Sequence, residues 1–127
     1  MYIVVLVSIL LIFLLGSIVS LGGLSYKGIP SKINSVFGYR TKASMASEEA
    51  WQEANRLAGK LGIQLGIVFI VINMLILLVC VILQIGKESL LLAYMPLITF
   101  IIEMVIIIVK VETHLKRNFD NKGRRKI

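Results

Sequence analysis

The sequence predicts an all-α integral membrane protein with three transmembrane helices. Of the 127 residues, 57% are hydrophobic, and the mean hydropathy of +0.89 is far above that of a typical soluble domain. Only 17% are charged, and most of these gather into two patches that leave three long apolar runs. Each run can cross a hydrocarbon core of roughly 30 Å at about 1.5 Å per residue. We therefore expect residues 1–127 to form one three-helix membrane domain.

The predicted spans cover about residues 2–24, 61–85 and 90–111. The first contains no charged residue and is similar in this respect to a secretory signal. It lacks the basic segment with which such signals begin, however, and its apolar run is longer than the roughly 7–15 residues that they contain. We therefore expect the first span to be retained as a helix.

Basic residues orient the predicted bundle. They cluster in segment 26–60, between the first two spans, and in the tail 113–127, whereas the N-terminus and the Lys87-Glu88 turn carry almost none. The positive-inside rule then puts both basic segments in the cytoplasm, with the N-terminus outside and the C-terminus inside. We expect the net charge of +7 to reflect this topology, and the basic tail to meet anionic membrane lipid and not nucleic acid.

Segment 26–60 is expected to begin as a loop and to end as a helix. Turn-forming residues fill its first part, and Pro30 disfavours helix at the residue before it. Ser47 is a candidate N-cap, and the acidic Glu48 and Glu49 that follow suit the positive end of a helix dipole. Because no proline follows until the third span, we expect the second helix to start in the cytoplasm and to continue through its span.

Small residues at a spacing of four form a ridge on this second helix. Such a ridge lets another helix approach closely, as in small-xxx-small membrane contacts. The partner is either the first span or a second copy of the chain, and the spacing alone does not choose between them. The ridge consists of Ala54, Ala58, Gly62 and Gly66.

Glu103 is the most costly residue of the third span. A carboxylate near the middle of a membrane is disfavoured by several kcal/mol unless it is paired, hydrated or protonated. Counted from the Lys87-Glu88 turn, Asn73 of the second span lies at nearly the same depth, so we expect a hydrogen bond between the two side chains. Two interpretations follow. Glu103 is a neutral acid that holds two helices together through Asn73, or it is a proton or cation site in a polar cavity.

The stretch Asn34 to Arg56 holds almost all of the chain's capacity for directed hydrogen bonds. Arg40 and Arg56 offer planar donor forks that suit phosphate or carboxylate, and Trp51 is of the kind that settles among lipid headgroups. One interpretation is an anion or headgroup site at the cytoplasmic face. The alternative is structural: hydroxyls cap the helix, the arginines pair with nearby glutamates, and Trp51 anchors the helix. The candidate residues are Gly38, Arg40, Thr41, Ser44, Ser47, Trp51, Asn55 and Arg56.

This stretch contains no activated nucleophile, so we expect no enzymatic activity. His114, the only histidine, has no second ligand at metal-binding spacing, and Cys80, the only cysteine, lies in the middle of the second span. The sequence indicates neither a metal nor a cofactor. A membrane enzyme that clamps a lipid phosphate between Arg40 and Arg56 is the weakest alternative.

The string FGYRTKASMASEEAWQEANR, Phe37 to Arg56, resembles the signature of the SdpI/YfhL family, the SdpI-type immunity proteins of bacterial membranes. In that signature a G-[YI]-R-T-x-x-[ST]-x-x-S-x-x-x-W-x-x-A-N pattern follows the first helix of a three-helix unit. The resemblance covers roughly residues 15–112, and this chain is one such unit whereas the founding member is longer. It carries over as motif positions Gly38, Arg40, Thr41, Ser44, Ser47, Trp51 and Asn55.

The resemblance implies self-protection. The founding member protects its producer cell from a secreted toxic peptide and sequesters a repressor at the membrane when the toxin is present. We therefore expect a multi-pass immunity protein of the bacterial cytoplasmic membrane that binds the toxic peptide or its target. Whether a soluble regulator docks at the cytoplasmic face and whether the chain forms a homo-oligomer stay open. The alternative from another class is a small transporter or ion-conducting oligomer that uses Glu103.

Overall fold

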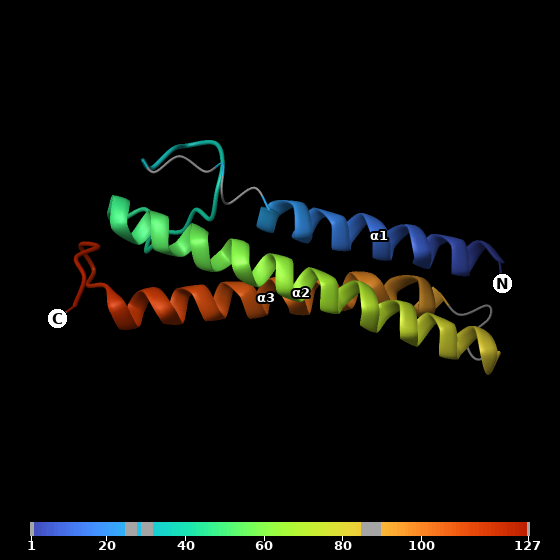
Figure 1. The fold of residues 1–127 in the computed structure, drawn as a ribbon. Coiled ribbons are helices and arrows are strands. Elements are labelled where there is room, and N and C mark those ends of the chain that lie inside the picture. Colours follow the sequence, from blue (N-terminus) through green and yellow to red (C-terminus); the bar gives the residue numbers. More distant parts are fainter. Residues whose placement is uncertain (1, 25–27, 29–31, 85–89, 127) are drawn as a thin grey trace.

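The structure, a computed structural model, describes residues 2–24, 28, 32–84 and 90–126. It confirms the all-helical fold class, because three helices run side by side in an elongated bundle (Figure 1). The expected turn at Lys87-Glu88 and the residue Pro30 lie outside the described residues. The helices are α1 (Tyr2–Leu24), α2 (Glu48–Ile82) and α3 (Leu90–Asn118).

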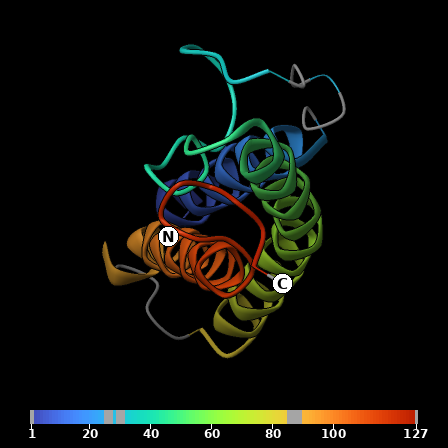
Figure 2. The ribbon, with the colours of Figure 1, turned by 90° about the vertical axis from the view of Figure 1, so that its left-hand side faces the viewer.

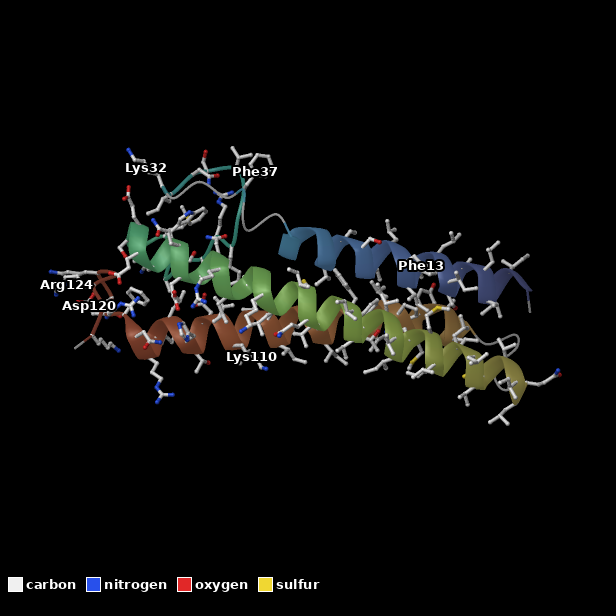
Figure 3. The ribbon with its side chains drawn as sticks, in the orientation of Figure 1. Phe13, Lys32, Phe37, Lys110, Asp120 and Arg124 are labelled. Carbon is white, nitrogen blue, oxygen red and sulfur yellow. The ribbon has the colours of Figure 1, made fainter. Side chains whose placement is uncertain are left out.

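All three pairs of helices pack against one another, as the view along the bundle illustrates (Figure 2). The start of α2, the end of α3 and the C-terminus lie together at one end of the bundle (Figure 1). This end carries most of the nitrogen and oxygen atoms of the side chains and is called the polar end below (Figure 3). The N-terminus lies at the opposite end.

The outer surface of the bundle is apolar away from the polar end. Helices α2 and α3 are long and apolar enough to cross a membrane, and a shorter apolar stretch of α1, Ile3–Val19, accompanies them. So many exposed large hydrophobic side chains are rare on a water-soluble surface, and they suit hydrocarbon instead. The fold is therefore that of a membrane protein. Examples of these side chains, each at least 52% exposed, are Phe13, Ile67, Leu75, Ile101 and Val105.

Helix α2 combines an apolar part with a long polar start, as the sequence predicts. Its 35 residues extend about 52 Å at 1.5 Å per residue, well beyond a hydrocarbon core of roughly 30 Å. The predicted N-cap is confirmed, because the Ser47 hydroxyl oxygen accepts a hydrogen bond from the Ala50 amide at 3.0 Å. The first turns of α2 therefore lie at the polar end and support the residues described below.

The small-residue ridge of α2 lies inside the bundle. Ala54, Gly62 and Gly66 are buried. Helix α1 also approaches α2 closely, because an added Cβ at Gly16 would overlap the side chain of Ile70. Small residues permit such short distances between helices. Three of the four ridge residues are thus buried within one chain, and the fourth, Ala58, is half-buried.

The tail predicted for residues 113–127 is part helix and part folded turn. Helix α3 continues to Asn118, beyond the predicted end of the third span. The chain then turns back on itself, and the Gly123 amide donates to the Asp120 carbonyl at 2.9 Å. Aspartate and glycine at the first and fourth positions favour a turn of this kind. The charged tail therefore contains the last turns of α3 and a hydrogen-bonded turn.

Candidate functional site

The motif loop, residues 32–46, folds over the start of α2 through the side chain of Asn55. This side chain accepts a hydrogen bond from the Tyr39 amide and donates one to the Trp51 carbonyl at 2.8 Å. Trp51 itself is fully buried. Gly38 has a φ of 112°, and an added Cβ would lie 2.6 Å from Asn55 Oδ1 and 2.9 Å from Trp51 Cη2. Packing therefore accounts for three motif residues, and glycine alone fits its position.

Thr41 and Ser44 close a single turn within the motif loop. The Thr41 amide donates to Ser44 Oγ at 2.8 Å, and the Ser44 amide donates to Thr41 Oγ1 at 3.2 Å. Ser44 Oγ also donates to the Tyr39 carbonyl at 2.8 Å, and Ser44 is fully buried. Such side-chain bonds satisfy backbone groups that have no helical partner. Both hydroxyls therefore hold the shape of the loop.

Glu112 of α3 joins the motif loop to the bundle. Its Oε1 atom accepts hydrogen bonds from the Tyr39 hydroxyl at 3.0 Å and from Thr41 Oγ1 at 2.7 Å. Burial, and then the hydrogen bond to Glu112 and its negative charge, raise the pKa of the Tyr39 hydroxyl well above its usual value. Glu112 was not among the residues predicted from the sequence. Its signal was an acidic residue directly after an apolar span, where a carboxylate needs donors close by.

Ser47 holds the C-terminal turn as well as the start of α2. Its hydroxyl donates to the Gly123 carbonyl at 2.6 Å. Gly123 has a φ of 73°, and an added Cβ would lie 2.7 Å from the carbonyl carbon of Ala46, so the two backbones are in close contact. Arg125 forms an ion pair with Glu49 at 2.6 Å. The end of the chain is thus fixed to the beginning of α2.

Arg56 pairs with Glu53, which also contacts His114 of α3. Glu53 Oε1 lies 2.9 Å from Arg56 Nη2 and 2.9 Å from His114 Nε2. The hydrogen bond from Arg56, supported by His114, lowers the pKa of the Glu53 carboxyl although partial burial opposes this. This is the pairing that the structural interpretation predicts for Arg56. Within the described residues, no third metal-binding side chain joins Glu53 and His114.

Arg40 differs from the other motif residues. Its side chain is exposed, and no hydrogen bond or ion pair joins it to the part of the chain that the structure describes. The predicted pairing with a glutamate therefore does not form for Arg40. The same loop exposes Val36 and Phe37, at 67% and 71%, and Phe37 points away from the helices (Figure 3). The loop thus presents a guanidinium and two apolar side chains to its surroundings.

A cleft of about 670 Å³ opens at the polar end between the motif loop, the end of α3 and the C-terminal turn. Lysine ammonium groups and carboxylates share its lining with apolar side chains. Such a surface can hold a ligand that combines an anionic group with an apolar part. The lining residues are Lys42, Ala43, Ala46, Glu112, Leu115, Lys116, Phe119, Asp120, Asn121 and Lys126.

The expected hydrogen bond between Asn73 and Glu103 is not formed. Asn73 Oδ1 accepts from Thr99 Oγ1 at 3.0 Å, and Asn73 Nδ2 donates to the Phe69 carbonyl at 2.9 Å. Thr99 lies one helical turn before Glu103 on α3, and it is Thr99 that contacts Asn73. Both carboxyl oxygens of Glu103 are buried without a hydrogen-bond partner among the described residues.

Comparison with known proteins identifies the family. Residues 31–111, which include the motif loop, the start of α2 and Glu103, match the SdpI/YfhL protein family. The chain belongs to this family. It is 44% identical over 54 residues to the uncharacterized protein YfhL of Bacillus subtilis (strain 168). That match covers 42% of this chain and 49% of the relative, so the chain spans about half the length of the relative it matches. No solved structure matches the chain.

Proposed function

We propose that this protein confers tolerance to a secreted, membrane-active toxic peptide. Family membership supports a function of the immunity type. In this proposal the protein lies in the bacterial cytoplasmic membrane, with the N-terminus outside and the polar end in the cytoplasm. The basic residues of the polar end favour this orientation by the positive-inside rule. It acts by binding the peptide or a lipid-associated target, and it catalyses no reaction.

The observation that carries the proposal is the difference between Arg40 and the other motif residues. Packing and local hydrogen bonds account for the glycine, the hydroxyls, Trp51 and Asn55. Arg40 makes no such contact within the described residues and extends from a loop that is otherwise tightly held. A side chain that the fold does not use, on a loop that the fold fixes, is suited to bind a partner.

The neighbours of Arg40 define what it can bind. Tyr39 and Thr41, on either side, both donate to Glu112 in the wall of the cleft, and Lys42 lines the same cleft. Arg40 is therefore a sequence neighbour of residues that contact or line a cleft with three lysines, and it shares its loop with the exposed, apolar Phe37. A guanidinium binds carboxylate or phosphate with two parallel hydrogen bonds, and the apolar neighbours suit the headgroup region of a membrane. The site is suited to the anionic part of an amphipathic ligand.

The test is survival of a sensitive bacterium that expresses the wild type or Arg40→Ala and is challenged with a panel of membrane-active peptides. We expect protection by the wild type and none by Arg40→Ala at equal membrane abundance. Arg40→Lys should protect only weakly, because an ammonium lacks the planar donor fork. Arg117→Ala, which removes an exposed arginine from α3, is the matched control and should protect fully. Full protection by Arg40→Ala would remove Arg40 from the mechanism, and no protection by the wild type would overturn the proposal.

A second candidate function is ion or proton conduction by an oligomer. The observation that favours it is the buried carboxyl of Glu103, which has no partner among the described residues. Proton-dependent flux into proteoliposomes that Glu103→Gln abolishes would support this function. Unchanged flux in the variant, or no flux in the wild type, would exclude it.

A further inference from the structure

An apolar groove runs between α2 and α3 in the apolar part of the bundle, away from the polar end. Its volume is about 150 Å³. Val68, Ile72 and Ile102 are each about half exposed at its rim, so the groove is open to the outside of the bundle. It is lined by Leu65, Val68, Phe69, Ile72, Asn73, Thr99, Ile102, Glu103 and Ile106.

Glu103 is the polar group in this groove that the fold leaves unsatisfied. It is only 5% exposed, and neither of its carboxyl oxygens has a partner among the described residues. Asn73 and Thr99 bind each other, and Asn73 also binds the backbone of its own helix, so neither is held towards Glu103. A buried acceptor without a donor is unfavourable, and the cost is relieved when a donor enters from outside.

The identity of the donor follows from the chemistry available at this depth. Lipid acyl chains carry no donor. Among the described residues, a second copy in the same orientation brings no cation to this depth either, because Lys110, the basic residue of α3 nearest to Glu103, is seven residues or about 10 Å away along the helix. A divalent metal ion needs several oxygen ligands, usually more than one of them a carboxylate, and Glu103 is the only carboxylate among the residues that line the groove. The donor must carry N–H groups and must also reach an apolar depth. A basic side chain on the apolar, membrane-inserted segment of a peptide meets both requirements.

We propose that the groove between α2 and α3 binds the membrane-inserted segment of a peptide, one basic side chain of which enters the groove and donates hydrogen bonds to Glu103. The groove has room for one such side chain, because a cavity of about 150 Å³ holds a molecule of the size of benzene. The apolar rim contacts the rest of the segment. This inference rests on the proposed function and specifies the ligand: a toxic peptide with an apolar segment and a basic residue within it.

The experiment uses a synthetic helical peptide of about 20 leucine and alanine residues with one central lysine, and the same peptide acetylated on that lysine. The full-length protein is placed in phosphatidylcholine nanodiscs with a photoreactive residue at Ile102 on the groove rim. A second protein sample carries the photoreactive residue at Phe13, which points away from α2 and α3 (Figure 3). The measured quantity is the peptide concentration that gives half-maximal crosslinking.

We expect the lysine peptide to crosslink at Ile102 at a roughly tenfold lower concentration than its acetylated form, because a charge-assisted hydrogen bond is gained. No such preference is expected at Phe13. Glu103→Leu should abolish the preference and keep normal membrane abundance, since it removes an unsatisfied polar group from an apolar site. Gln64→Leu, at an exposed polar position of α2 outside the groove lining, should retain the preference.

Equal crosslinking of the two peptides at Ile102, or a preference that survives in Glu103→Leu, would overturn the groove proposal. Either result leaves the immunity function intact if the wild type still protects cells and Arg40→Ala does not. Failure of the immunity function can also be told apart from failure of the groove proposal. A clear lysine preference in a protein that protects against no peptide would support the groove and refute the immunity function.

Discussion

Gly38→Ala is expected to open the motif loop, because this position combines a left-handed backbone with a close approach to α2. A φ of 112° costs an alanine about 1–3 kcal/mol of strain. The added methyl group would lie 2.6 Å from Asn55 Oδ1 and 2.9 Å from Trp51 Cη2, and overpacking of this kind costs about 1–3 kcal/mol more. The sum of about 2–6 kcal/mol corresponds to at least a roughly 30-fold rise in the equilibrium constant for loop opening.

The assay uses the only tryptophan of the chain. Trp51 is fully buried, so opening should shift its fluorescence to longer wavelength and increase its quenching by acrylamide. Hydrogen exchange at the Tyr39 amide, which donates to Asn55, should accelerate by at least roughly 30-fold. Gly28→Ala is the matched control, because an added Cβ there meets nothing within 4 Å. If Gly38→Ala behaves like this control in both measurements, the reasoning about the position is wrong.

Two further predictions concern the contacts between the motif loop, α2 and α3. The pKa of Glu53 is lowered in the folded protein, so its pairing stabilises the fold above the ordinary glutamate pKa of about 4.3, and this contribution is lost as the pH falls through the lower folded-state value. Glu53→Gln should therefore lower the thermal midpoint at neutral pH and match the wild type in acid, and a difference independent of pH would contradict this assignment. Tyr39→Phe should reduce the unfolding free energy by about 1–3 kcal/mol through the lost bond to Glu112, whereas Tyr94→Phe, at an exposed tyrosine, should have little effect. A double-mutant cycle of Tyr39→Phe with Glu112→Gln should show a coupling of about 1 kcal/mol, and strict additivity would refute the contact.

The helices could be predicted from the sequence because a membrane-spanning segment must be long and continuously apolar. For the third span only the end of the apolar run was predicted, and the continuation of α3 to Asn118 was not, since the charges after that run were interpreted as a tail. The overlooked signal is a spacing of four. Val111, Leu115 and Phe119 follow one another at that interval, and all three are buried in the core at the polar end. Packing of these three side chains stabilises α3 beyond the apolar run, and the extended helix places Glu112 beside the motif loop.

The motif identified which residues matter at the polar end but not what each of them does. Its serine, threonine and asparagine side chains suit either ligand binding or local hydrogen bonding, and their chemistry does not distinguish the two uses. Only the positions of their partners decide, and for Ser47 and Thr41 some of these partners come from distant segments. Ser47 meets Gly123, and Thr41 meets Glu112. A motif read along one segment therefore overstates the number of residues free to bind a ligand. Among the motif residues that the structure describes, Arg40 is the one whose side chain is exposed and forms no hydrogen bond or ion pair with the described part of the chain.

Glu103 shows why depth alone does not predict a contact in a helix bundle. Counting residues at a fixed rise places Asn73 and Glu103 at a similar depth, but it gives no information on the direction in which each side chain leaves its helix. The side chain of Thr99, one turn earlier on α3, points towards Asn73 and donates a hydrogen bond to it. With Asn73 engaged, the interpretation of Glu103 as a neutral acid that holds two helices together loses the partner on which it depends. The buried carboxyl of Glu103, which has no partner among the described residues, therefore supports the proposed contact with a peptide in the groove.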